Sequence, residues 1–192
     1  MLDTTLFYVF LFNSGVNLYV RHLLTKSILQ KRGYVQKTGY VQWRWWCERS
    51  VQVVGFFLVS AILLGYDVPG TVSHNAFLKV CGAVTLTISV ALHLRAKYDL
   101  GINWTNAVFG ATVLPGPITE HGLYKYSRNP MYTATLGMVF GLVLMTQNLF
   151  VVCLWIALLA YFEVVIRSEE IFLRAYKGNK YVAYCKRVPR FL

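Results

Sequence analysis

Five apolar runs alternate with basic stretches along this chain, and this pattern constrains its fold more than any other feature. The runs cover residues 4–20, 51–66, 76–94, 130–145 and 149–166. A hydrocarbon core about 30 Å thick needs about 20 helical residues, so each run reaches spanning length only with flanking residues. We therefore predict an all-α integral membrane bundle of five transmembrane helices.

The cationic residues predict how this bundle is oriented. Eighteen of the 19 Lys and Arg residues lie at 21–49, 95–128 and 167–190, and the exception is Lys79 near the outer end of the third run. Cytoplasmic loops of membrane proteins collect Lys and Arg. Five spans with the N-terminus outside and the C-terminus cytoplasmic place all three stretches inside, in a bacterial inner membrane or the endoplasmic reticulum. Lys79 is expected to snorkel toward the headgroups.

Composition limits the partners of the chain. Apolar residues make up 56% and charged residues 14% of it, and its formal net charge is +11. Because the charge is interleaved with lipid-length apolar runs, we expect a membrane with anionic headgroups as the partner and no nucleic acid. The four cysteines form no Cys-x-x-Cys pair and have no His at ligand spacing, so neither a disulfide framework nor a metal site is predicted.

The last two apolar runs are predicted to form a helical hairpin. Only residues 146–148 separate them, and so short a link forces the two helices to run antiparallel. Gly137 and Gly141 lie on one face of the first helix, which allows a neighbouring backbone to approach closely. Arg128 precedes the hairpin and an acidic group ends it, so both are expected at the same membrane face.

Two polar segments on the predicted cytoplasmic side precede this hairpin. Residues 31–49 mix Trp and Tyr with basic residues, which predicts an amphipathic segment on the membrane or, alternatively, a gate for the substrate. Residues 116–132 are rich in Gly, Pro and Tyr and place Arg128 at the mouth of the fourth span. That arginine is either an ordinary positive-inside anchor or part of a site.

The acidic group lies at the end of the fifth run. Glu163 and Arg167 are one helical turn apart and are expected to neutralise each other. Glu169 and Glu170 are adjacent, so both cannot face Arg167, and at least one of them needs another cation. Acidic side chains near the end of a membrane helix are costly unless paired, which makes them candidates for a site.

The order of motifs in residues 95–192 resembles the isoprenylcysteine carboxyl methyltransferase family, including its phospholipid methyltransferase-like bacterial relatives. The family pattern is Gly-x-Tyr-x-x-x-Arg-(His/Asn)-Pro-x-Tyr, then a hairpin, Glu-Glu-x-x-Leu, Tyr-x-x-Tyr and Val-Pro. Here the matching residues are Gly122, Tyr124, Arg128, Asn129, Pro130, Tyr132, Glu169, Glu170, Leu173, Tyr181, Tyr184, Val188 and Pro189. The segment 101–104 also looks like a family element. Together the motifs predict one methyltransferase domain over residues 1–192, with two N-terminal helices (1–67) and a catalytic core (76–192).

The resemblance implies that S-adenosylmethionine binds on the cytoplasmic side without a Rossmann domain. Arg128 and Glu170 would be catalytic, with Arg128 holding the substrate or the cofactor carboxylate, and Glu169 or Glu170 would contact the cofactor's amino group. Position 165, where the family has a substrate-binding arginine, is Val, so Arg167 is the nearest candidate. The residues implied to line the cofactor pocket are Pro117, Ile118, Thr119, Tyr124, Asn129, Pro130, Met131, Tyr132 and Glu169.

The acceptor implied by the resemblance is lipid-like or prenylated, with isoprenylcysteine carboxyl O-methylation as the first interpretation. Asn129, where prenylcysteine-specific members carry His, favours phospholipid N-methylation instead. An amine acceptor would have to lose a proton, for which His121 or a Tyr is available. An NADPH-dependent enzyme like the membrane sterol reductases and a non-catalytic scaffold are the remaining alternatives.

Overall fold

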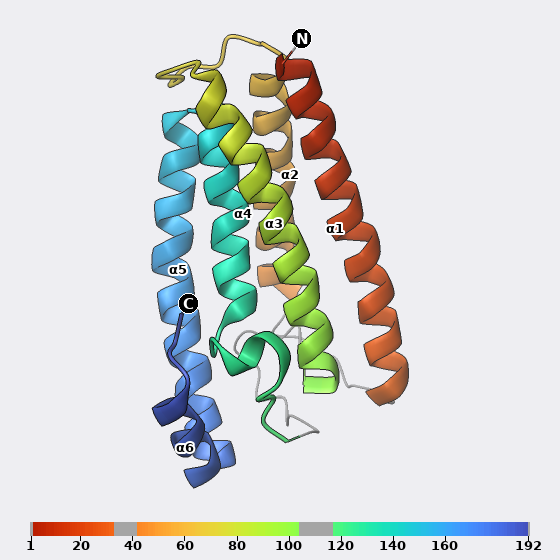
Figure 1. Ribbon diagram of the computed structural model, residues 1–192, viewed down its shortest axis with the longest axis vertical. Helices are drawn as coiled ribbons and strands as arrows, with labels where there is room; N and C mark the ends of the chain where they lie inside the picture. The colour runs from red at the N-terminus through yellow and green to blue at the C-terminus, as the bar shows by residue number, and fades with distance from the viewer. Residues whose placement is uncertain (1, 33–41, 104–116, 192) are drawn as a thin grey trace.

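The computed structural model describes residues 2–32, 42–103 and 117–191, and within these ranges all regular elements are helices. The elements run from one end of an elongated bundle to the other, with the N-terminus and the short helix α6 at opposite ends (Figure 1). Their bounds are α1 (Leu2–Arg32), α2 (Gln42–Leu63), α3 (Ala76–Leu100), η2 (Gly101–Asn103), η3 (Gly122–Lys125), α4 (Pro130–Thr146), α5 (Leu149–Lys177) and α6 (Asn179–Arg187). The predicted all-α class is therefore confirmed.

Each predicted apolar run lies within or close to one of the five long helices, but several helices extend beyond their run. The fifth apolar run ends at residue 166, and α5 continues through the polar sequence that follows to Lys177, ending where Gly178 adopts a positive φ of 58°. α3 likewise continues to Leu100. Because these extensions are helical, the charged residues that follow the apolar runs keep a fixed orientation relative to the bundle.

Two of the helices in the described ranges are long and apolar enough to cross a membrane. They are the helical segments Ala76–Asn103 and Leu149–Lys177, while Gln52–Leu63 and Pro130–Thr146 are shorter apolar helices. α1 has 31 residues but is not among them, and its apolar run is interrupted by Asn13, Ser14 and Asn17. Length and composition thus identify two candidate spans.

The predicted hairpin is present in the structure and its turn is fixed from both sides. α4 ends at Gln147, which adopts the left-handed conformation (φ 49°, ψ 40°), and Asn148 caps α5 by accepting a hydrogen bond from the Phe150 amide (2.9 Å). Gln147 also exchanges hydrogen bonds with the backbone of Asn75, at 3.0 and 2.8 Å. The Asn148 amide donates to the Pro69 carbonyl at 3.1 Å. The hairpin turn is therefore joined to the loop that precedes α3.

The closest contact between helices joins α3 and α4 through glycines. A Cβ atom on Gly82 would lie 2.6 Å from the Gly141 carbonyl oxygen, and a Cβ on Gly141 would lie 2.8 Å from the Gly82 carbonyl oxygen. Gly137 packs against the Ser89 side chain. The prediction of a glycine face on the fourth span is confirmed, and its partner is a matching glycine on α3. Small residues allow this approach because neither backbone carries a side chain at the contact.

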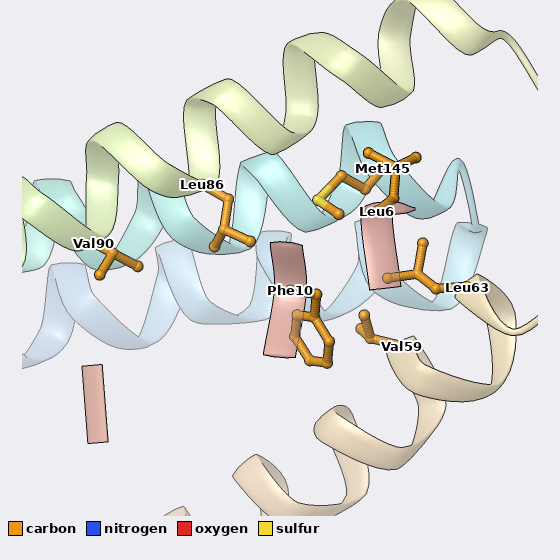
Figure 2. Close-up of a cluster of buried hydrophobic side chains, with 7 residues drawn as sticks. All are labelled: Leu6, Phe10, Val59, Leu63, Leu86, Val90 and Met145. Atoms are coloured by element: carbon orange, nitrogen blue, oxygen red, sulfur yellow. The ribbon is translucent and has the colours of Figure 1, made fainter. Parts of the chain in front are cut away.

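An apolar core lies at the end of the bundle away from α6. Figure 2 shows side chains of α1, α2, α3 and α4 converging there; the buried members are Leu6, Phe10, Val59, Leu63, Leu86, Val90 and Met145. Lys79 does not extend freely toward the headgroups as expected, because it is buried and pairs with Asp3 at the start of α1. Farther along the same two helices, the buried Lys97 amine donates to the Thr25 hydroxyl at 2.6 Å.

The glycine contact predicts a specific sensitivity to added volume. Gly82→Ala should lower the free energy of unfolding by about 1–3 kcal/mol, because the new methyl group would overlap the α4 backbone. Thermal unfolding in detergent would measure the change. Gly55→Ala on α2 is the matched control, since a Cβ there meets no atom within 4 Å and alanine is the better helix former. Equal stability of the two variants would contradict the close approach.

Candidate active site

The candidate site lies at the α6 end of the bundle, where the start of α4, the last turns of α5 and the C-terminal segment meet (Figure 1). Pro130 begins α4, so Arg128 and Asn129 lie just before the first turn while Tyr132 lies within it. Glu163, Glu169 and Glu170 lie on α5. The antiparallel hairpin therefore brings the motif around Arg128 and the acidic group to the same end, as predicted.

Glu170 is the centre of a buried ion-pair network. Its side chain is 7% exposed, and its Oε1 forms an ion pair with Nη1 of Arg128 (3.1 Å), whose side chain is 11% exposed. Arg190 binds both carboxylate oxygens, through Nε to Oε1 (3.2 Å) and Nη2 to Oε2 (2.7 Å). These bonds raise the pKa of Arg190. Two guanidinium partners compensate the burial of this carboxylate and fix its position.

Glu169 faces a different environment from its neighbour. Its Oε1 accepts a hydrogen bond from the Tyr132 hydroxyl at 2.6 Å, and this neutral phenol is the partner that the structure gives it within the described residues. The Tyr132 ring packs edge-on against Phe162 on α5, with ring centroids 4.8 Å apart. The described partner of Glu169 is therefore a neutral donor, whereas Glu170 pairs with two cations.

The guanidinium of Arg128 has a buried donor, Nε, without a hydrogen-bond partner among the described residues. Its Nη1 contacts Glu170 and also the sulfur of Cys185 on α6 at 2.8 Å. Its Nε is buried and has no hydrogen-bond partner among the described residues. Burying an N–H group without a partner is costly, so this atom is suited to an acceptor from a ligand. Next to Glu170 in the sequence, Glu169 has a neutral phenol as its partner among the described residues. An orphan guanidinium N–H and such a carboxylate suit the two charged groups of a zwitterion.

The C-terminal strap, residues 188–191, closes over the start of α4. The Arg128 amide donates to the Pro189 carbonyl (2.9 Å), and the carbonyl of residue 190 accepts from the Ser127 hydroxyl (3.2 Å) and the Asn129 amide (3.1 Å). The side chain of Asn129, expected in the cofactor pocket, thus holds the strap. Val188 anchors the strap in a small cluster with Tyr181, Tyr184 and Ile118.

The loop before α4 is held by the end of α3. Asn103 donates from its amide to the Pro117 carbonyl (2.6 Å) and the Thr119 hydroxyl (3.0 Å). Asp99 accepts from the Leu123 amide at 2.9 Å. Gly122 has φ 59°, and a side chain there would overlap the Asp99 carboxylate. The predicted pocket residues of this loop are therefore positioned by two polar residues of the preceding helical segments.

Tyrosines of the site are donors and not proton acceptors. The Tyr184 hydroxyl donates to the Tyr124 carbonyl at 2.7 Å, and burial raises the pKa of Tyr184 to about 12. Burial also raises the pKa of Tyr124 and of Tyr181. These phenols stay protonated near neutral pH, so none of the three is suited to remove a proton from an acceptor. His121, the other candidate for that role, is exposed.

Arg167 lies on the exposed side of this network. Its Nε pairs with Oε1 of Glu163 at 2.6 Å, which confirms the predicted pair one helical turn apart. The same Glu163 oxygen accepts from Nη1 of Arg190 at 3.1 Å. Among the described residues, Arg167 is linked to Arg190 through Glu163. The side chains of the basic aromatic segment 31–49 lie outside the described part of the chain. Of the predicted element 101–104, residues 101–103 form η2 and Trp104 lies outside the described residues.

Three residues of the site were missed by the sequence analysis. Arg190 directly follows the Val-Pro motif. The sequence feature that could have identified it is that Glu170 needs a cation. Asp99 was visible as an acidic residue inside a basic stretch. His93 on α3 lies beside the motif, with Nδ1 3.2 Å from the Thr135 hydroxyl, which itself donates to the Met131 carbonyl (2.9 Å). No local pattern marked His93, because it lies in an apolar run.

Comparison with known proteins agrees with this geometry. A search against individual curated proteins found no significant match. Residues 77–179, more than half of the chain, match the family described as phospholipid methyltransferase. That range covers α3, the loop, the α4–α5 hairpin and both glutamates of the site. The chain therefore belongs to the phospholipid methyltransferase family, a family of membrane methyltransferases that includes the isoprenylcysteine carboxyl methyltransferase-like proteins.

Proposed function

We propose that this chain transfers a methyl group from S-adenosylmethionine to a lipid-like acceptor at the membrane surface. The observation that carries the proposal is the separation of charge between adjacent acids. Glu170 is neutralised by Arg128 and Arg190, while Glu169 contacts the neutral Tyr132 hydroxyl. Membership of a methyltransferase family supports the same activity.

The charges of the site fit the amino acid end of S-adenosylmethionine. In this proposal Glu169 binds the ammonium group, and the orphan Nε of Arg128 binds the carboxylate. A guanidinium suits a carboxylate better than an ammonium does, because its donors lie in one plane. Glu170 contributes indirectly by holding Arg128. Residues of the loop 117–124, which Asn103 and Asp99 position, would line the remainder of the pocket.

The reaction asks little of the protein beyond placement. S-adenosylmethionine supplies a methyl group already activated by its sulfonium centre. The chain has to align the acceptor with that methyl and keep water out, which can contribute several kcal/mol through orientation alone. The site agrees with this requirement, since it consists of fixed ion pairs and of tyrosines that stay protonated.

Ligand binding by matched variants tests this assignment. S-adenosylhomocysteine should raise the thermal midpoint of the wild-type chain by mass action. Glu169→Gln keeps the acceptor for Tyr132 but removes the charge, so it should bind the ligand about 2 kcal/mol, or roughly 30-fold, more weakly. Glu120→Gln is the control, because it removes an acid from the exposed pair with Arg187 (2.5 Å).

The same measurement separates the competing functions. A shift with NADPH and none with S-adenosylhomocysteine would favour a sterol-reductase-like enzyme. Stability unchanged by either nucleotide would favour a non-catalytic scaffold. Equal binding of S-adenosylhomocysteine by Glu169→Gln and by wild type would exclude Glu169 from the cofactor site.

We further propose that all five long helices span the membrane with the α6 end in the cytoplasm. Two helices qualify by length and composition, and α4 lies antiparallel to α5 along most of its length. α1 and α3 run side by side, with Asn13 donating to the Thr87 hydroxyl at 3.1 Å and Lys97 to Thr25. These polar groups of α1 and α3 thus bind each other inside the bundle, as a lipid environment requires.

Accessibility of introduced cysteines tests this orientation. In a variant without the native cysteines, His74→Cys in the exposed loop before α3 should react with a membrane-impermeant maleimide in intact cells. Arg187→Cys on the exposed face of α6 should react only after permeabilisation. The reverse labelling pattern would show that the bundle has the opposite orientation. Labelling of both sites in intact cells would exclude an odd number of spans between them.

For the acceptor we propose a prenylcysteine-like carboxylate, with a phospholipid amine as the second candidate. Asn129 and the family description favour the amine. The structure gives Asn129 another task, since its amide binds the carbonyl of residue 190. The buried tyrosines favour the carboxylate, because an acceptor that is already anionic needs no proton acceptor.

The pH dependence of the rate distinguishes the two acceptors. A carboxylate acceptor is fully ionised above neutral pH, so kcat/KM should change little between roughly pH 8 and 9. An amine has to lose a proton first, so kcat/KM should rise about tenfold per pH unit below the amine pKa. Initial rates with a prenylated cysteine analogue and with phosphatidylethanolamine vesicles measure this. If only one acceptor is methylated and its kcat/KM rises steeply with pH, the carboxylate assignment is contradicted.

A further inference from the structure

The C-terminal strap joins the two halves of the site. Its backbone accepts hydrogen bonds from three consecutive residues before α4, namely Ser127, Arg128 and Asn129. Its Arg190 side chain reaches α5 and binds Glu163 and Glu170 there. One residue therefore contacts the Arg128 segment through its carbonyl and the acidic group through its guanidinium.

Arg190 also determines how much of Glu170 is available to Arg128. It forms a bidentate pair with the carboxylate, at 3.2 and 2.7 Å, and leaves Oε1 to be shared with Nη1 of Arg128 at 3.1 Å. Arg128 therefore contacts Glu170 through a single terminal nitrogen, and its Nε remains without a partner among the described residues. Without Arg190 both carboxylate oxygens would be open to Arg128, whose guanidinium would turn to form a side-on pair through Nε and Nη2. That pair would occupy the Nε donor that the ligand needs.

We propose that Arg190 is a positioning residue that holds Glu170 so that the Nε of Arg128 stays available to the cofactor's carboxylate. This role rests on the proposed function. Arg190 acts through Glu170 and does not itself contact the ligand. Its exposure of 31% against 7% for Glu170 agrees with a place at the rim of the site.

Equilibrium binding of S-adenosylhomocysteine to the purified full chain tests this role. Arg190→Ala should bind the ligand about tenfold more weakly, because Arg128 would pair more fully with Glu170. Arg190→Lys keeps the charge but loses the planar fork, so it should fall between Arg190→Ala and wild type. Arg187→Ala is the control, since it removes an exposed arginine from the adjacent helix and breaks only the pair with Glu120.

A double-mutant cycle separates positioning from mere stabilisation. In a Glu170→Gln background, Arg190→Ala should weaken binding by less than about twofold, because the residue through which it acts has lost its charge. The thermal midpoint of each variant without ligand, and kcat and KM for S-adenosylmethionine, are measured in parallel. An increase in KM that exceeds the loss in kcat is expected for Arg190→Ala.

Each outcome decides the proposal. If Arg190→Ala binds the ligand like wild type, Arg190 has no positioning role, even where the thermal midpoint falls. If its effect is undiminished in the Glu170→Gln background, it does not act through Glu170. If wild type itself binds no S-adenosylhomocysteine, the proposed function fails and the role of Arg190 fails with it. Weaker binding by the folded Arg190→Lys supports the role where Arg190→Ala does not fold.

Discussion

The buried carboxylate of Glu170 is the interaction on which the site depends. It lies where α5, the start of α4 and the C-terminal strap meet, and it binds one guanidinium from each of the last two. Burying a charge costs several kcal/mol unless partners compensate, so removing either arginine would leave a poorly compensated charge. Three segments far apart in the sequence are therefore held at fixed distances by one side chain.

The bundle makes this meeting possible by fixing the hairpin at its other end and along its length. Gln147 and Asn148 join the hairpin turn to the loop before α3. Gly82 and Gly141 then bring the α3 and α4 backbones into contact. Since α3 also positions the loop through Asp99, a change in its distance from α4 would move both the loop and Arg128. The glycine contact is therefore coupled to the geometry of the site.

The sequence predicted the helices and the hairpin because lipid leaves few options for a backbone. It also predicted that Glu169 and Glu170 cannot both face Arg167, so that at least one of them needs another cation, and Glu170 has two. It could not predict the partners themselves. Arg190 reaches Glu170 only because the strap turns back over α4, and the pairing of Gly141 with Gly82 depends on which helix packs there. Such contacts depend on tertiary packing and cannot be predicted from the spacing of residues in the sequence. His93 was hidden for the same reason.

Asn129 shows why a residue within a motif can be a poor guide to the acceptor. Its amide binds the carbonyl of residue 190, and its own carbonyl accepts from the Thr133 hydroxyl at 3.1 Å. The asparagine side chain at this position is thus explained by the strap, whatever the acceptor. The distinction between a carboxylate and an amine then depends on whether a proton acceptor faces the methyl group. Tyrosines whose pKa is raised by burial are poor proton acceptors. Their presence therefore favours a nucleophile that is already ionised when it binds.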